Sequence, residues 1–449
     1  MAGVSATVVL VAFDSTIVTT TLPRVAAALN GMALYAWVGT AYLLATAASI
    51  LIFGRLGDMY GRKPLMLVSV SLVALGSIAC GLAQSMPQLI AFRTLQGIGG
   101  GMMIATAFAA PADLFPDAGQ RVRWMALVSA TFAMASGIGP VLGGAATQAL
   151  GWRAAFFISP LAAIAALFLL ARYFPRIRPA QTASRRIDWV GGLLLIVVVG
   201  APLAAIELAF APGDGAHPRV ALALAVAGIA AVALLVPIER RVRSPIFPLR
   251  VLAGVEPRLL NLAAVAVGAT MFILIFYSPL LLQHELDYSP SEAGLLLTPL
   301  VAAISFGSII NGRLFPKQTE PQRLMVFGSC LLAAGSAMML AVSDGTSAWW
   351  IVAAFFVNGT ALGFLLPNLT LFMQMLSERR DVGVASALVQ TTRAMGSAAG
   401  TALVGIAISH SSVLDGVRAG LILCVLLSLF SAVVAHRVKM KNVAATPAA

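Results

Sequence analysis

The stretch Gly54-Arg-Leu-Gly-Asp58-Met-Tyr-Gly61-Arg62-Lys63 decides the fold class, because it is a short, basic, glycine-punctuated segment between two long apolar runs. Its glycines permit a very tight reversal of the backbone. Arg55, Arg62 and Lys63 would hold such a reversal on the cytoplasmic side of a membrane, where basic residues concentrate in loops. The stretch therefore predicts a hairpin between two membrane-spanning helices.

The composition of the whole chain supports the same class. Hydrophobic residues make up 60% of the sequence and charged residues 10%, against averages of about 45–50% and 25% in globular domains. Apolar runs of roughly 20 residues, the length of helix that crosses about 30 Å of hydrocarbon, recur throughout. We predict an all-α integral membrane protein with fourteen spans, near residues 4–22, 35–53, 65–83, 87–109, 124–149, 154–171, 189–210, 220–237, 259–282, 292–311, 324–342, 348–374, 383–408 and 418–435.

The net charge of +12 would suggest a nucleic-acid partner in a soluble protein. With both termini cytoplasmic, however, the predicted topology places 23 of the 29 basic residues in cytoplasmic segments. This positive-inside asymmetry accounts for the charge and removes the argument for nucleic acid. The first apolar run carries Asp14 and lacks a basic leading segment, so we expect a retained span rather than a secretory signal.

Two segments rich in arginine and proline, 173–188 and 239–257, divide the spans into six, two and six. The predicted domains are a six-helix bundle (1–172), cytoplasmic linkers with two inserted spans (173–258), and a second six-helix bundle with a short cytoplasmic tail (259–449). The outer bundles show weak internal similarity. Gly54-Arg55-Leu56 recurs as Gly312-Arg313-Leu314, and Gln96-Gly97 as Asn358-Gly359. Such repeats are typical of transporters that bind their substrate between the halves near the bilayer midplane.

Metal, disulfide and nucleotide chemistry lack support in the sequence. Cys80, Cys330 and Cys424 lie in predicted spans without disulfide or metal spacing, and the four histidines also lack ligand spacing. No Gly-x-x-x-x-Gly-Lys-Ser/Thr loop is present, so ATP is not expected to drive the protein. We predict that the chain is not an enzyme and has no metal or organic cofactor.

Several motifs in matching spans and order resemble those of the major facilitator superfamily. The opening stretch is similar to the family's loop between helices 2 and 3, residues 89–99 to its arginine motif in span 4, and residues 137–144 to its antiporter motif in span 5. Residues 13–23 resemble the first-span signature of drug:proton antiporters. With fourteen spans, the chain resembles the EmrB/QacA type. It departs from that pattern at Ala135, commonly glycine, and at residues 19–21, and the repeat at 312–314 lacks an acid matching Asp58.

The resemblance implies two six-helix bundles plus two additional transmembrane helices in the cytoplasmic (inner) membrane of a bacterium. It also implies proton-coupled, secondary-active efflux of amphipathic or hydrophobic compounds, as in multidrug resistance, with the proton as coupling ion. The expected partners are therefore a small amphiphile, protons and lipid, and a periplasmic adaptor is left open. Two alternatives remain: a dedicated exporter of one metabolite, siderophore or sugar, and a membrane sensor that does not transport.

Asp14 and Arg93 are the predicted proton-coupling pair. An ionised side chain within hydrocarbon needs a partner or water, and such residues commonly mark ion pathways. Arginine stays protonated at any relevant pH, so Asp14 is the expected proton carrier. The structural alternatives are a fixed hydrogen bond for Asp14 and a fixed ion pair for Arg93. The roles of Arg393 and Glu207, also within predicted spans, stay open.

Three further sets of residues are predicted to act in transport. The substrate cavity would be lined by Asp14, Thr21, Gln96 and Asn358. The predicted antiporter motif consists of Gly139, Pro140, Gly143 and Gly144. Its glycines would let another helix approach closely and so seal the cavity against protons, and its proline would bend the helix. A cytoplasmic gate would be formed by Gly54, Asp58, Gly61, Arg62 and Lys63, in which the aspartate meets the arginine or a helix start. For this set a static loop anchor is the alternative.

Overall fold

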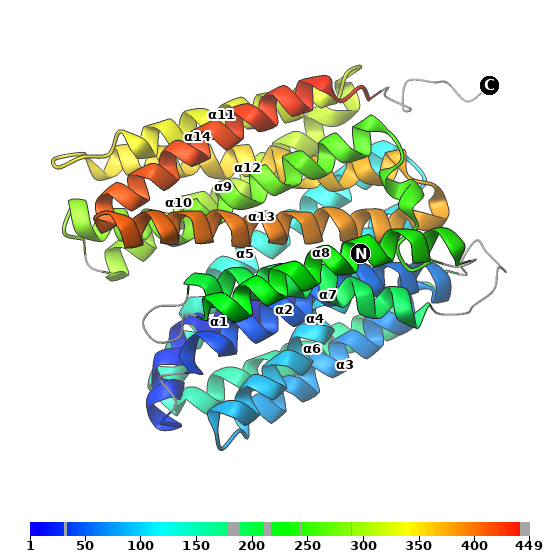
Figure 1. Ribbon diagram of the computed structural model, residues 1–449, viewed down its shortest axis with the longest axis horizontal. Coiled ribbons are helices and arrows are strands. Elements are labelled where there is room, and N and C mark those ends of the chain that lie inside the picture. The colour runs from blue at the N-terminus through cyan, green and yellow to red at the C-terminus, as the bar shows by residue number, and fades with distance from the viewer. Residues whose placement is uncertain (31–33, 178–187, 211–216, 243–244, 289, 441–449) are drawn as a thin grey trace. The chain divides into compact units, whose positions relative to one another are not determined.

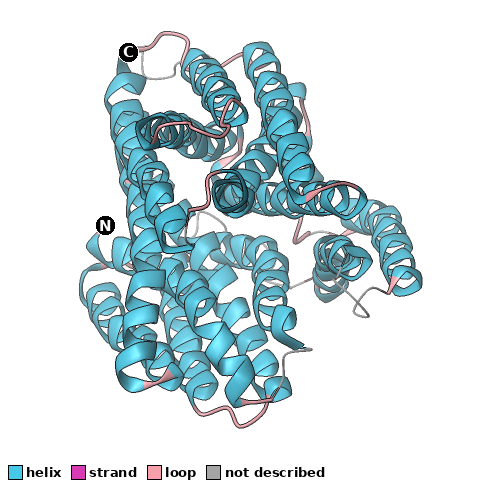
Figure 2. Cartoon of the chain, turned by 90° about the vertical axis from the view of Figure 1, so that its left-hand side faces the viewer, coloured by secondary structure: helices cyan, strands magenta, loops and turns pink. Residues whose placement is uncertain are grey.

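A computed structural model describes residues 1–30, 34–177, 188–210, 217–242, 245–288 and 290–440. These residues form helices and loops without strands (Figures 1 and 2). The α-helices are α1 (Ala2–Ala28), α2 (Tyr35–Tyr60), α3 (Arg62–Gly81), α4 (Met86–Leu114), α5 (Ala118–Leu150), α6 (Trp152–Tyr173), α7 (Trp189–Phe210), α8 (Pro218–Arg241), α9 (Val255–Glu285), α10 (Pro290–Leu314), α11 (Gln322–Leu340), α12 (Ala348–Leu376), α13 (Val382–His410) and α14 (Val413–Arg437). Short 3-10 helices are η3 (Leu249–Leu252), η4 (Phe315–Lys317) and η5 (Arg379–Asp381).

Each predicted span coincides with one of these α-helices. Within the described residues, ten helices are long and apolar enough to cross a membrane: α2, α3, α5, α6, α8, α9, α10, α11, α12 and α14. Shorter apolar segments occur in α1 (Ala2–Val18) and α7 (Trp189–Pro202). The remaining two helices, α4 and α13, are not among these candidate spans, and each contains an arginine and several glycines. The chain is therefore a multi-pass membrane protein, and the count of fourteen spans stays a prediction.

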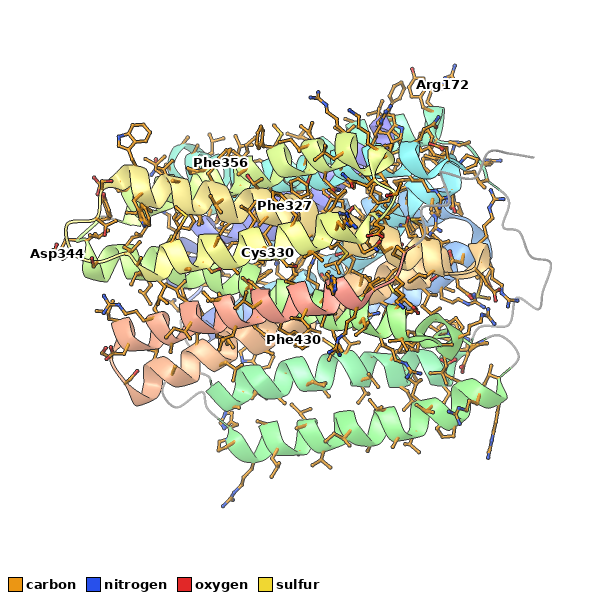
Figure 3. All side chains as sticks on the ribbon, turned by 90° about the horizontal axis from the view of Figure 1, so that it is seen from above. Arg172, Phe327, Cys330, Asp344, Phe356 and Phe430 are labelled. Carbon is orange, nitrogen blue, oxygen red and sulfur yellow. The ribbon has the colours of Figure 1, made fainter. Side chains whose placement is uncertain are left out.

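Large apolar side chains on the outer faces of the helices fit a lipid environment. Phe327 on α11, Phe356 on α12 and Phe430 on α14 are 53%, 42% and 46% exposed (Figure 3). Water penalises apolar surface of this kind, whereas lipid tails are themselves apolar. The surface of these helices is consistent with direct contact to acyl chains.

The chain packs into two compact units, each assembled from separate segments. Unit 1 comprises residues 1–114, 134–251 and 377–391, and unit 2 comprises 115–133, 252–376 and 392–449. Helices α5 and α13 therefore contribute residues to both units. The inserted helices α7 and α8 pack together in unit 1, where α7 also packs on α2. The predicted division into three consecutive domains stays a prediction.

Glycines bring α4 against α2 in unit 1. Gly97 faces the carbonyl oxygen of Tyr42, and Gly101 faces that of Thr46, so closely that a Cβ at either glycine would collide with the carbonyl. Small residues four apart allow this close approach of two membrane helices. On the neighbouring α3, Gly76 lies against Gln96.

Unit 2 repeats this arrangement between α12 and α10. Gly359 faces the carbonyl oxygen of Leu300, and Gly363 faces that of Ile304. The shift of 258 residues that aligns Gly54 with Gly312 takes Tyr42 to Leu300 and Thr46 to Ile304. One sequence match aligns α2 with α10, and the other aligns α4 with α12. Because both lead to the same glycine–carbonyl contact in each unit, the packing supports the internal repeat predicted from the sequence.

The predicted reversal between the second and third spans is a single residue, Gly61. Helix α2 ends at Tyr60 and α3 begins at Arg62, and Gly61 between them has φ of 87° and ψ of 154°. A side chain makes this backbone conformation strongly unfavourable, so glycine is required here. The prediction of a very tight hairpin is confirmed.

Replacing Gly359 by valine should destabilise unit 2, because the added side chain meets the Leu300 carbonyl in a close helix contact. Overpacking of this kind typically costs about 1–3 kcal/mol. The measurement is the thermal denaturation midpoint of the purified protein in detergent. Gly200→Val in α7 is the matched control, because a Cβ there has open space. Equal midpoints for the two variants would contradict the packing.

Candidate functional site

The carboxyl group of Asp14 lies at the centre of a buried polar cluster in unit 1. Asp14 belongs to α1 and is 1% exposed. Its Oδ1 accepts hydrogen bonds from Ser77 Oγ of α3 at 3.2 Å and from Ser159 Oγ of α6 at 3.4 Å. Gln96 Nε2 of α4 donates to the same oxygen. Three helices thus direct polar groups at one acid.

Arg93 of α4 is the counter-ion of Asp14. Its Nη1 lies 3.6 Å from Asp14 Oδ2 and donates to the Asp14 main-chain carbonyl at 3.4 Å. The guanidinium also stacks over the ring of Tyr42 from α2, with Cζ 4.1 Å from the ring centroid. Arg93 is 1% exposed, so the pair is enclosed on all sides by protein. The sequence predicted this pair, and the structure brings it together.

Gln96 connects the two charges through the opposite ends of its amide. Its Nε2 donates to Asp14 and to Ser77 Oγ, the latter at 2.5 Å, and its Oε1 accepts from Arg93 Nη1 at 2.7 Å. The Cys80 thiol lies against the same oxygen at 3.6 Å. The amide orientation is fixed by these contacts, because the NH2 group faces the carboxylate and the oxygen faces the guanidinium.

This arrangement can hold or release one proton. A buried ion pair is strongly destabilised when one partner loses its charge, because the other charge is left uncompensated. Asp14 Oδ2 accepts no hydrogen bond from the described side chains, although it lies near Arg93. A proton added to this carboxyl would weaken its attraction to Arg93 and release the guanidinium for other partners.

The other two predicted cavity residues lie in separate places. Thr21 is fully buried in unit 1, and its hydroxyl lies 3.1 Å from the Thr147 hydroxyl of α5. Asn358 is fully buried in unit 2, where its Oδ1 accepts from Ser336 Oγ at 3.3 Å and Gly335 packs on its amide. Both side chains are engaged with neighbouring helices here, and their place in a substrate cavity stays a prediction.

Asp58 joins α2 to the start of α13 within unit 1. Its carboxylate accepts hydrogen bonds from the main-chain nitrogens of Gly383 at 2.9 Å and Val384 at 3.2 Å. Negative charge is favoured at a helix start, where backbone N–H groups lack internal partners. Arg62 Nη2 donates to Asp58 at 3.0 Å, and Arg62 also pairs with Asp113 of α4. The predicted contacts of Asp58 with an arginine and a helix start are confirmed.

The remaining gate residues also contact other segments of unit 1. Gly54 packs on Gly383 and Ala387 of α13 so closely that a Cβ would clash. Lys63 Nζ donates to the carbonyl oxygens of Ala171 at 2.8 Å and Phe174 at 2.5 Å, at the end of α6. The basic hairpin thus links the ends of three other helices, α4, α6 and α13. Its function as a gate stays a prediction.

A second charge cluster at this end of unit 1 was missed in the sequence. Asp381 of η5 pairs with Arg55 of α2 at 3.1 Å and with Arg250 of η3 at 2.6 Å. Arg55 Nε also donates to the Pro245 carbonyl at 3.0 Å. The hydrogen bonds that Arg250 donates to the Asp381 carboxylate raise the pKa of Arg250 above its ordinary value. Sequence reasoning treated these arginines only as topology signals, and no local spacing relates positions so far apart.

The glycine motif of α5 provides one close helix contact in unit 1. Gly139 faces the Thr16 hydroxyl of α1, and a Cβ would collide with it. Gly143 is buried and Gly144 is half-buried. Helix α5 continues through Pro140, whose side chain lies outside the described part of the chain, as does that of Glu207. The close approach at Gly139 is confirmed, and its role in excluding protons stays a prediction.

Comparisons with known proteins agree on one family. The model of the Major Facilitator Superfamily matches residues 4–401, with a second match over 262–442. The chain is 30% identical over 395 residues to Multidrug resistance protein 3 of Bacillus subtilis, covering 88% of this chain and 76% of that protein. It is 30% identical over 400 residues to Multidrug transporter protein MdtP of Bacillus subtilis, covering 88% and 72%. The crystal structure of the human organic anion transporter MFSD10 (TETRAN) superposes with a TM-score of 0.71 at 15% identity, covering 96% and 98%.

Asp58→Asn should lower the thermal denaturation midpoint, because it removes the charge shared by Arg62 and the start of α13. A loss of at least about 2 kcal/mol is expected for a buried charge with these partners. The control is Asp117→Asn, since Asp117 is exposed and its carboxylate accepts one bond at the start of α5, from the Gln120 nitrogen. Asparagine substitutes well in that position. A midpoint as low for the control would argue against a special role of Asp58.

Proposed function

Since the chain belongs to the Major Facilitator Superfamily and is a membrane transporter rather than an enzyme, we propose that it exports amphipathic or hydrophobic compounds in exchange for protons. The names of its relatives support multidrug efflux as the physiological role. The observation that carries proton coupling is the enclosed pair of Asp14 and Arg93, bridged by Gln96. Asp14 is the proposed proton carrier.

In the proposed cycle, Asp14 alternates between an ionised form paired with Arg93 and a protonated form. The ionised form attracts a cationic or polar group of the substrate when the pocket opens, and protonation releases that group. Ser77, Ser159 and Gln96 hold the carboxyl in place in the ionised form. The driving force is adequate, since one charge moved through 100 mV supplies about 2.3 kcal/mol.

Alternating access is the proposed mode of transport, by rocking of two six-helix bundles about a central cavity lined in part by Asp14, Thr21, Gln96 and Asn358. The bonds from the start of α13 to Asp58, together with Arg62, Lys63, Gly54 and Gly61, form the proposed cytoplasmic gate. Opening requires that these bonds break. Gly139, Pro140, Gly143 and Gly144 are proposed to limit proton leak along α5.

The proposed setting is the cytoplasmic membrane of a bacterium, with both termini inside and fourteen spans of the EmrB/QacA type. The positive-inside charge distribution supports this orientation. A dedicated exporter of a single compound is the alternative within the same fold, and a resistance profile limited to one compound would favour it. A sensor without transport is less favoured, because the complete charge pair at Asp14 suits a cycle of proton exchange.

Asp14→Asn should abolish substrate-induced proton movement while the protein stays in the membrane, because the amide cannot exchange a proton. The measurement is proton flux in inverted vesicles challenged with a panel of cationic and neutral amphiphiles. The control is Asp344→Asn, in the exposed turn between α11 and α12 (Figure 3).

Responses to several unrelated compounds in wild type and control, absent in Asp14→Asn, would support a polyspecific antiporter. Unchanged proton-driven transport in Asp14→Asn would remove Asp14 from the mechanism. A wild type that responds to no compound would redirect the search to a single natural metabolite.

A further inference from the structure

A second arginine, Arg393 of α13, lies in unit 2 against α9, one of the ten candidate membrane spans. It sits about a third of the way along the 29-residue helix α13 and is half-buried. The Arg393 side chain leaves α13 against Gly268 of α9, where a Cβ would come within 2.8 Å of Arg393 Cγ. Gly396 and Gly400 continue the close contact of α13 with α9. The backbone around Arg393 is therefore firmly held.

Unlike Arg93, Arg393 has no acidic partner among the residues that the structure describes. The surrounding hydrogen bonds use neutral groups. Ser397 Oγ donates to the carbonyl oxygens of Gly268 at 3.1 Å and Arg393 at 2.9 Å, and Thr392 Oγ1 donates to Asn261 Oδ1 at 3.0 Å. None of these bonds neutralises the guanidinium, so its positive charge is available to a group from outside the protein.

The internal repeat does not place an acid in unit 2 either. Aligning Pro23 with Pro279 takes Asp14 to Thr270, which is fully buried. Aligning Gln96 with Asn358 takes Arg93 to Phe355, also fully buried. Unit 2 therefore lacks a copy of the charge pair of unit 1, and Arg393 is a charge of its own rather than half of a repeated pair.

An arginine packed on a membrane helix stays protonated, and an unpaired charge there is costly. Its planar fork of donors fits the paired oxygens of a carboxylate or a similar oxyanion. Met271 and Phe272 follow Gly268 by one turn on the same face of α9, and both are partly exposed. A ligand at Arg393 would thus meet a positive charge beside an apolar surface.

We propose that Arg393 binds the acidic group of transported amphiphiles, so that organic anions with an apolar body belong to the substrates of this protein. The proposal rests on the export function proposed above and adds a substrate class to it. Arg393 selects among ligands by charge, whereas Met271 and Phe272 accept the apolar part regardless of charge. Export of an anion is also favoured by an interior-negative membrane potential.

Two fluorescent probes of nearly the same shape test the proposal. N-phenylnaphthylamine is neutral, and anilinonaphthalene sulfonate adds one sulfonate to the same ring system. Binding is measured by fluorescence titration of the full-length protein in nanodiscs, against protein-free nanodiscs, and export is measured in vesicles. The variants are Arg393→Gln and Arg393→Lys. The control is Arg323→Gln, which removes an equal charge from an exposed position at the start of α11.

Arg393→Gln is expected to weaken sulfonate binding about ten- to a hundredfold, as for loss of a charged hydrogen bond, and to leave the neutral probe within about twofold. Arg393→Lys should give a smaller, equally selective loss, because it keeps the charge without the fork. Arg323→Gln should match wild type for both probes. If Arg393→Gln does not fold, the selective loss in Arg393→Lys still tests the proposal.

Equal losses for the two probes would assign Arg393 to packing and overturn the proposal. Unchanged sulfonate binding in both Arg393 variants would also overturn the proposal, as would a wild type that binds and exports only the neutral probe. Either result would leave the proposed export of amphiphiles intact. A wild type that neither binds nor exports either probe would count against the export function itself. The two proposals therefore fail by different results.

Discussion

The structure depends on one constraint: inside a membrane, a charge or polar group has to find its partner within the protein or in a ligand. Water is absent from the hydrocarbon, so an unmatched group is costly. In unit 1 this constraint draws α1, α2, α3, α4 and α6 together around Asp14 and Arg93. The same constraint gives Arg393 its significance in unit 2, where the described neighbours are neutral.

Close backbone contact is what allows such polar groups to meet. Gly97 and Gly101 bring α4 against α2, and the matching pair in unit 2 brings α12 against α10. The two units therefore share a packing scheme inherited through the repeat. The units differ in the polar groups buried at this packing. Gln96 bridges two charged side chains, whereas Asn358 bonds a serine and the backbone of its own helix. One scaffold thus holds a titratable centre in one unit and a neutral contact in the other.

The helices and the buried charge pair could be predicted from the sequence, each for a different physical reason. Apolar length predicts helices because a span has to match the bilayer, so the positions of the fourteen α-helices among the described residues were anticipated. Asp14 and Arg93 were recognisable because charge is rare in such runs. The contact of Asp381 with Arg55 and Arg250 was not, since these residues are ordinary in loops and only the fold brings them together. The bonds of Thr21 to Thr147 and of Asn358 to Ser336 were not anticipated either, and the place of Thr21 and Asn358 in a substrate cavity stays a prediction.

The single residue between α2 and α3 also restricts how this protein can move. Gly61 contributes two backbone torsions, in a combination that glycine alone adopts readily, and Lys63 anchors the next turn to the end of α6. Such a junction works as a rigid corner and not as a joint. We therefore expect α2 and α3 to move together in any rearrangement of the chain, with the pivoting in longer connections elsewhere.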